Sequence, residues 1–127
     1  MKYLIDSFAW IEYFEGTEIG NKAKKFIDSD NDLYSINLTI SEVVSRFKRK
    51  KCDFESAYNA IITLSKVIEI SPELAKKAGI LHADLKDKIN NFGLVDALII
   101  TLARELKAKV LTGDQHFRGF NEVVFIK

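Results

Sequence analysis

The sequence predicts a three-layer α/β fold in which helices cover both faces of a mainly parallel sheet. Short apolar runs typical of strands alternate with longer segments whose apolar residues recur at helical spacing. Strands separated by helices require crossover connections, which make the strands parallel, and parallel strands are usually buried on both faces. The chain has 127 residues, 47% of them hydrophobic, and a single proline. We therefore expect one domain over residues 1–127.

The first half of the chain alternates between the two patterns. A short apolar run ends at Asp6, and helical spacing then begins at Trp10. Asp53 is a suitable N-cap for a later helix. The predicted elements are, in order, a strand over 3–5, a helix carrying Trp10, Ile11 and Phe14, a polar helix around 22–27, a strand over 33–36, and helices over 39–50 and 54–65.

The second half continues the alternation to the end of the chain. Ser71 and Pro72 form a helix start, with serine as the N-cap and proline in the first turn. A break is expected at 90–93, where two asparagines and a glycine interrupt the apolar pattern. The predicted elements are a strand over 67–70, a helix from 72 to about 85, a helix over 94–107, and strands over 109–112 and 122–126.

Charge and cysteine content exclude some classes of protein. The 19 Lys and Arg against 18 Asp and Glu leave a net charge of +1, so any nucleic-acid contact must come from a local patch. The lone Cys52 cannot form an intrachain disulfide, which favours a reducing, cytoplasmic setting. Neither a targeting segment nor a transmembrane segment is visible.

Four acidic residues, far apart in the sequence, are predicted to meet at one edge of the sheet. In a crossover fold, the carboxyl ends of the strands and the N-termini of the following helices lie at the same edge. Asp6 directly follows the first strand, and Asp114 follows the strand over 109–112 after one glycine. Glu42 and Asp96 are each expected in the first turn of a helix.

Such a cluster favours a bound cation. Two carboxylates about 5 Å apart repel by about 3 kcal/mol at an effective dielectric near 20, so either some stay protonated or a cation joins them. Asp96 lies inside an otherwise apolar run, where a buried charge needs a partner. Carboxylate oxygens without Cys or His suit Mg²⁺ or Mn²⁺, and such ions serve phosphodiester hydrolysis by activating water.

Each acid also has a purely structural interpretation. Thr39 and Glu42 match a capping box, in which Glu42 would satisfy only the Thr39 amide. Asp96 would complement a helix dipole, Asp114 would cap a short turn, and Asp6 would cap a helix. Only the joint placement of the four acids favours a functional site.

Four segments that contain these acids resemble PIN-domain ribonucleases, and among them the small toxins of VapBC toxin–antitoxin pairs. The segments are Leu4-Ile5-Asp6-Ser7, Thr39 through Val44, Gly93 through Ile99, and Val110 through Phe117. The resemblance implies a PIN fold and a Mg²⁺- or Mn²⁺-dependent endoribonuclease that acts as a toxin, with a VapB-like antitoxin as partner. It further implies that Asp6, Glu42, Asp96 and Asp114 bind metal and that Ser7 and Thr112 support them.

The sequence departs from this family at His116, where many members have a further acid. This departure puts a second metal site in doubt. His116 would instead contact the phosphate or have no chemical role, and we favour a structural or surface role for it, as for His82.

A basic run follows the helix that carries Glu42. Its cations are Arg46, Lys48, Arg49, Lys50 and Lys51. An RNA backbone would lie there, at the periphery of the site, or the run is a solvated helix end whose cations complement the helix dipole. Trp10, Tyr13 and Phe14 are expected in the core, and Phe54 and Tyr58 are expected to support a homodimer.

The same residues bear on several other functions. A magnesium-dependent phosphatase needs a second acid two residues after the first, where this chain has Phe8. A phospho-acceptor domain needs paired acids near the start, which are also missing. A non-catalytic binding module is less favoured because all four acids are present, whereas a PIN nuclease of RNA processing stays open as the closest alternative.

Overall fold

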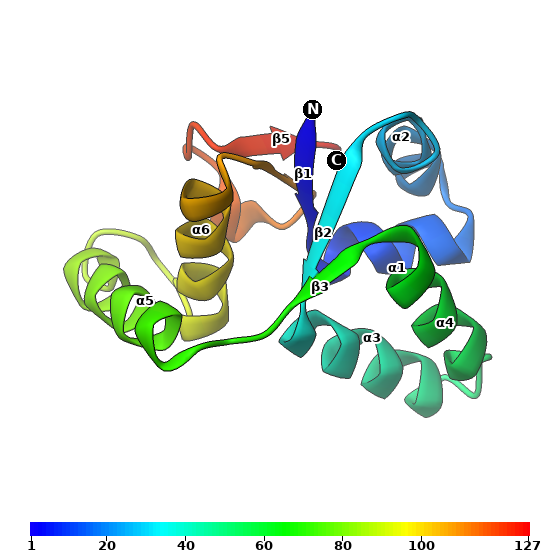
Figure 1. Cartoon of the computed structure of the whole chain (residues 1–127), viewed down its shortest axis with the longest axis horizontal. Helices are drawn as coiled ribbons and strands as arrows, with labels where there is room; N and C mark the ends of the chain where they lie inside the picture. The colour runs from blue at the N-terminus through cyan, green and yellow to red at the C-terminus, as the bar shows by residue number, and fades with distance from the viewer.

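The computed structural model describes residues 1–127 and contains one five-stranded sheet (Figure 1). The strand order is β3-β2-β1-β4-β5, and every pair of neighbours is parallel. The strands are β1 Lys2–Ile5, β2 Asp32–Ile36, β3 Lys66–Ile68, β4 Lys109–Thr112 and β5 Val123–Phe125. The predicted parallel sheet is confirmed.

Six α-helices cover the two faces of this sheet. They are α1 Ser7–Glu15, α2 Glu18–Ile27, α3 Asn37–Arg49, α4 Phe54–Leu64, α5 Pro72–Leu85 and α6 Leu94–Leu106, with a short 3₁₀ helix over Gln115–Phe117. Figure 1 shows α5 and α6 on one side of the sheet and α1 to α4 on the other. The three-layer prediction is therefore confirmed. No helix combines the length and the apolar character needed to cross a membrane.

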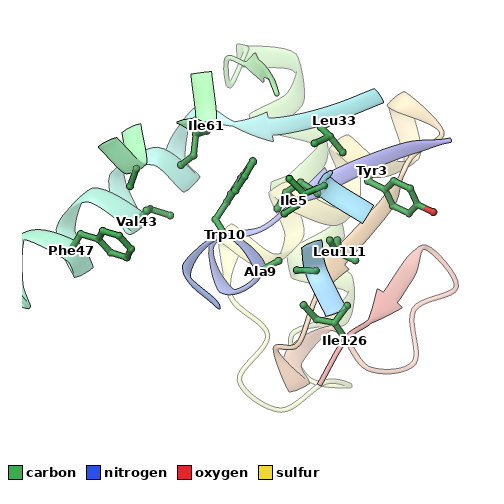
Figure 2. Close-up of a cluster of buried hydrophobic side chains, with 13 residues drawn as sticks. Tyr3, Ile5, Ala9, Trp10, Leu33, Val43, Phe47, Ile61, Leu111 and Ile126 are labelled. Atoms are coloured by element: carbon green, nitrogen blue, oxygen red, sulfur yellow. The ribbon is translucent and has the colours of Figure 1, made fainter. Parts of the chain in front are cut away.

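The core is divided between the two faces of the sheet. In β1, Tyr3 and Ile5 pack with α1 to α4, whereas Leu4 packs with α5 and α6. This division follows from the alternation of side chains along a strand. Figure 2 shows the first cluster, in which Trp10 of α1 lies among side chains of the sheet and of α3.

Trp10 is fully buried, as predicted, and its indole N–H has a hydrogen-bond acceptor. Its indole Nε1 donates to the Ser35 hydroxyl at 2.9 Å, and the Phe14 ring stacks on it at 5.4 Å between centroids. The hydrogen bond to Ser35 ties α1 to β2, whereas the stacking of Trp10 and Phe14 lies within α1. Because α1 begins directly after β1, the same packing fixes the position of Asp6.

Helix α3 begins earlier than predicted. It starts at Asn37, directly after β2, and no side chain caps it. Glu42 is therefore in the second turn, and the prediction that it lies in the first turn is wrong, as is the capping box with Thr39. Strand β2 ends at the buried Ile36, and α3 begins at the next residue. The packing of Ile36 in the core, rather than a capping side chain, therefore determines where the helix starts.

The strand order places a crevice between β1 and β4. The chain runs from β1 through β2 to β3 on one side and returns to β4 and β5 on the other side of β1. Ligand crevices in parallel sheets form outside the carboxyl ends of the strands at such a reversal. Register pairs Ile5 with Leu111, so Asp6 and Thr112 follow side by side at this position.

Candidate active site

The four predicted acids line one small cavity at this crevice. Its volume is about 70 Å³, well above the roughly 10–15 Å³ that one water molecule needs. Helices α3 and α6 carry Glu42 and Asp96, whereas Asp6 directly follows β1 and Asp114 follows β4. The lining residues are Asp6, Ser7, Thr39, Glu42, Val95, Asp96, Ile99, Asp114 and Phe117.

Asp6 is the most deeply buried of the four acids, at 5% exposure. Its Oδ1 accepts from the Ala9 amide at 3.0 Å, and its Oδ2 accepts from the Thr112 hydroxyl at 2.6 Å. Burial nevertheless raises the pKa of Asp6 to about 7, with smaller contributions from Asp114 and Glu42. Asp6 thus caps α1 and is also part of a crowded group of carboxylates.

Two of the other acids show the same tendency. Burial raises the pKa of Glu42, with further contributions from Asp96 and Asp114, while the Ser7 hydroxyl acts in the opposite direction. Burial also raises the pKa of Asp96, and the Asp114 charge adds to this effect, whereas the Gly93 amide and His116 act in the opposite direction. Asp6, Glu42 and Asp96 are thus each close enough to another carboxylate for its negative charge to disfavour their own ionisation.

Thr112 and Asp114 form a connected pair at the end of β4. The Thr112 hydroxyl donates to Asp6 and accepts from the Asp114 amide at 3.0 Å. Asp114 Oδ1 in turn accepts from the His116 amide at 2.9 Å and caps the 3₁₀ helix. Thr112 and the short helix therefore orient two of the acids.

Capping and clustering coincide at Asp96 and Asp114. Asp96 Oδ2 accepts from the Gly93 amide at 2.8 Å at the start of α6, and Asp114 caps its own turn as described above. Both residues still line the cavity. The structural interpretations of these two acids are therefore correct without excluding a functional one.

Two residues of the site escaped the sequence analysis. His116 Nδ1 lies 3.4 Å from Asp96 Oδ2 and 3.6 Å from Asp114 Oδ1, and nothing in the sequence predicts these two contacts. Thr39 lines the cavity, and its buried hydroxyl has no hydrogen-bond partner. Spacing offers a signal for Thr39, because it precedes Glu42 by three residues and shares its helix face.

His82 has the structural role that was expected. Its Nε2 is 3.1 Å from the Phe92 carbonyl oxygen, and its ring stacks on that of Phe92.

The basic run does not join the cavity. It lies at the C-terminal end of α3, where Arg46 pairs with Glu15 at 3.6 Å and Lys48 lies over the Phe54 ring. Arg49 Nε donates to the Ser45 hydroxyl at 3.4 Å. These contacts fit the interpretation as a solvated helix end, and they leave Lys50 and Lys51 exposed.

The site is suited to a hard divalent cation. The four carboxylates, of which Asp6, Glu42 and Asp96 have raised pKa values, form with the unpartnered Thr39 hydroxyl a set of oxygen ligands that a cation would stabilise. An ion bound here would favour the ionised form of every acid.

Comparison with known proteins agrees with this fold. Residues 3–123 match the PIN domain family, and the chain therefore belongs to that family. The chain matches none of the curated proteins.

Several solved structures share the fold. A toxin–antitoxin complex from Klebsiella pneumoniae superposes with a TM-score of 0.75 at 22% identity, covering 98% of each chain. VapC20 of Mycobacterium tuberculosis, described as a sarcin–ricin loop cleaving toxin, superposes with a TM-score of 0.75 at 20% identity. The match covers 95% of this chain and 98% of VapC20. The structure of VapBC2 from Rickettsia felis, bound to a promoter DNA fragment, superposes with a TM-score of 0.73 at 18% identity. The match covers 98% of this chain and 97% of the Rickettsia chain.

Proposed function

We propose that this PIN-domain protein is a metal-dependent endoribonuclease that acts as the toxin of a toxin–antitoxin pair. The convergence of Asp6, Glu42, Asp96 and Asp114 on one cavity carries the proposal. A domain that had kept only the fold would have no need for four carboxylates that destabilise one another.

In this proposal the four acids hold Mg²⁺ or Mn²⁺, and the bound ion supplies activation of water and charge stabilisation at the phosphate. Thr112 holds Asp6 by a direct hydrogen bond, and Ser7 lies beside Glu42. The two hydroxyls thus limit the rotamers of two ligands. The open crevice at the end of β1 and β4 is where a phosphodiester would approach.

RNA is the proposed substrate, and the cytoplasm is the proposed location. VapC20, which shares this fold, is described as a sarcin–ricin loop cleaving toxin, and this supports the choice of RNA over DNA. Arg46, Lys48, Arg49, Lys50 and Lys51 are proposed as peripheral phosphate contacts. Of these, Lys50 and Lys51 are the best placed, because they are exposed and make no ion pair.

A VapB-like antitoxin is the proposed partner. Toxin–antitoxin complexes with this fold support a two-protein system. A cationic side chain of the partner can replace the metal among the four acids, and arginine suits this role because it stays charged and binds a carboxylate with two hydrogen bonds.

A homodimer through α4 is also proposed. Tyr58, Ile62 and Leu64 are exposed at 39%, 46% and 40%, although they are apolar or aromatic. Phe54, at the start of the same helix, lines a shallow groove with Tyr58. A second copy that packs on α4 would cover these side chains.

The test of the function is RNA cleavage by purified protein with Mg²⁺ or Mn²⁺. Asp96→Asn should abolish cleavage and keep the fold, because asparagine can still accept from the Gly93 amide. Asp53→Asn is the matched control, since Asp53 also caps a helix but lies outside the cavity. Near-normal cleavage by folded Asp96→Asn would contradict the metal site.

The toxin role needs a second test in cells. Expression of the chain alone should arrest growth, and co-expression with the neighbouring gene should yield an inactive complex. A harmless chain whose neighbour neither binds nor inhibits it would favour the alternative of an RNA-processing PIN nuclease.

A further inference from the structure

The imidazole of His116 lies beside two of the acids. Its Nδ1 is 3.4 Å from Asp96 Oδ2 and 3.6 Å from Asp114 Oδ1, and one ligand atom from each of the three residues lies within 4.8 Å of the others. The three residues come from two different elements, because Asp96 is in α6 and the other two follow β4.

These distances differ from those of direct hydrogen bonds. An N–H donor and an oxygen acceptor normally lie about 2.7–3.2 Å apart. Two ligand atoms that each lie about 2.1 Å from one ion are separated by about 3.0 Å at a right angle and by about 4.2 Å when opposite. Both observed distances fall in the range of atoms that share an ion.

The backbone around His116 holds the ring in this place. The His116 amide donates to Asp114 Oδ1 at 2.9 Å, and the next residue, Phe117, is buried at 2% exposure. The His116 side chain is itself 40% exposed, so an ion can reach it from solvent. The short helix thus holds the imidazole beside Asp96 and Asp114, two of the acids that line the cavity.

A second observation points to a ligand in the adjoining cavity. Thr39 is fully buried, lines the same cavity as Asp96 and Asp114, and its hydroxyl has no partner. An unpartnered buried hydroxyl is costly, and a water molecule on a bound ion would satisfy it.

We propose that Asp96, Asp114 and His116 form a mixed nitrogen and oxygen site that selects Mn²⁺ and related transition ions over Mg²⁺. Imidazole is a good ligand for first-row transition ions, whereas Mg²⁺ requires oxygen ligands and keeps much of its water. His116 is thus the residue that determines metal specificity. This inference rests on the proposed function, because it assumes that the acidic site binds a divalent ion.

The experiment compares metal affinity in chelator-treated protein. Isothermal titration with Mn²⁺ and with Mg²⁺ gives the ratio of the two affinities, and the visible spectrum of bound Co²⁺ reports nitrogen ligation directly. The variants are His116→Asp, which offers oxygen in place of nitrogen, and His82→Asn, which removes the other imidazole of the chain. Thermal melts confirm that each variant is folded.

We expect His116→Asp to lower the preference for Mn²⁺ over Mg²⁺ about tenfold and to change the Co²⁺ spectrum, while His82→Asn changes neither. An unchanged ratio and spectrum in His116→Asp would overturn the inference while leaving the proposed nuclease intact. Wild-type protein that binds neither Mn²⁺ nor Mg²⁺ would overturn both.

Discussion

Asp6 shows how one buried carboxylate links the site to stability. Its pKa, raised from 3.8 to about 7 mainly by burial, means that the folded protein disfavours the ionised form. This rise corresponds to about 4 kcal/mol of folding free energy, which is present at low pH and lost as the pH increases from about 4 to 7. Metal-free protein should therefore lose stability over this window.

The measurement is denaturant unfolding of wild type and Asp6→Asn across this pH range, with a chelator present. Asparagine still accepts from Ala9 and can donate to Thr112, so the variant should fold, and its advantage over wild type should grow with pH. The quantity to compare is the difference in unfolding free energy between the two proteins at each pH. Carboxylates such as Asp53, whose pKa is lowered by Ser56, make stability rise with pH, and their contribution is the same in both proteins and cancels. A pH-independent difference would show that Asp6 titrates normally.

Thr39 gives a second prediction at the scale of one residue. Its hydroxyl is buried without a partner, so replacing it with a methyl group in Thr39→Val should stabilise the metal-free protein by about 1 kcal/mol. Thr101→Val is the matched control, because the Thr101 hydroxyl is buried but donates to the Ala97 carbonyl at 2.7 Å. The control should lose about 1 kcal/mol. Equal losses in both variants would mean that Thr39 is satisfied in solution.

At the scale of elements, the packing of α2 on α1 depends on one glycine. A Cβ at Gly20 would lie 2.0 Å from the Glu12 carbonyl oxygen, so the two helices approach too closely for any side chain. Gly20→Ala should cost about 1–3 kcal/mol or more, because the backbone must shift. Gly79 in α5 has open space around it, and Gly79→Ala should instead gain about 0.5–1 kcal/mol.

Thermal melts of the two alanine variants check this contrast. Because Gly20 is remote from the acidic cavity, folded Gly20→Ala should keep the metal preference of wild type. A stable Gly20→Ala variant would show that α2 can move away from α1 without cost.

Local signals predicted most elements, and the exceptions have a common cause. Ser71 and Asp53 cap α5 and α4 as expected, since each cap is made within a few residues. The start of α3 was misplaced because buried Ile36, rather than a side-chain cap, determines it. The position of His116 was also missed, because it depends on α6 and the turn after β4 meeting in space.

At the scale of the whole molecule, the sequence predicts which edge of the sheet the acids share. It does not predict the hydrogen bonds that orient their side chains there. Strand order follows from alternating strands and helices, and that order brings together Asp6 and Asp114 from opposite ends of the chain. The sequence contains no comparable signal for which oxygen each acid turns toward the cavity. Hydrogen bonds such as that from Thr112 to Asp6, across 106 positions, determine this orientation.

The near-neutral net charge of +1 conceals the local excess of negative charge at the acidic cavity. If the proposed metal site binds an ion, the stability of the whole domain should depend on that ion. An ion that binds only the folded state at a hundred times its dissociation constant adds about 2.7 kcal/mol, or about 10 °C in melting temperature for a chain of this size. Asp114→Asn should raise the melting temperature without metal, since it relieves repulsion on Asp6, Glu42 and Asp96. The same substitution should reduce the increase in melting temperature that Mn²⁺ produces, because one ligand is lost.

Scanning calorimetry of both proteins, with chelator or with millimolar Mn²⁺, measures these two opposite effects in one experiment. Potassium chloride at matched ionic strength is the control, because general screening would stabilise the wild type without any site. If wild type and Asp114→Asn melt alike in chelator and respond alike to Mn²⁺, the carboxylates do not act as one charged group. Opposite changes would tie the acidic cavity to the folding free energy of the entire chain, since only a shared site makes one substitution stabilise the metal-free protein and weaken its response to metal.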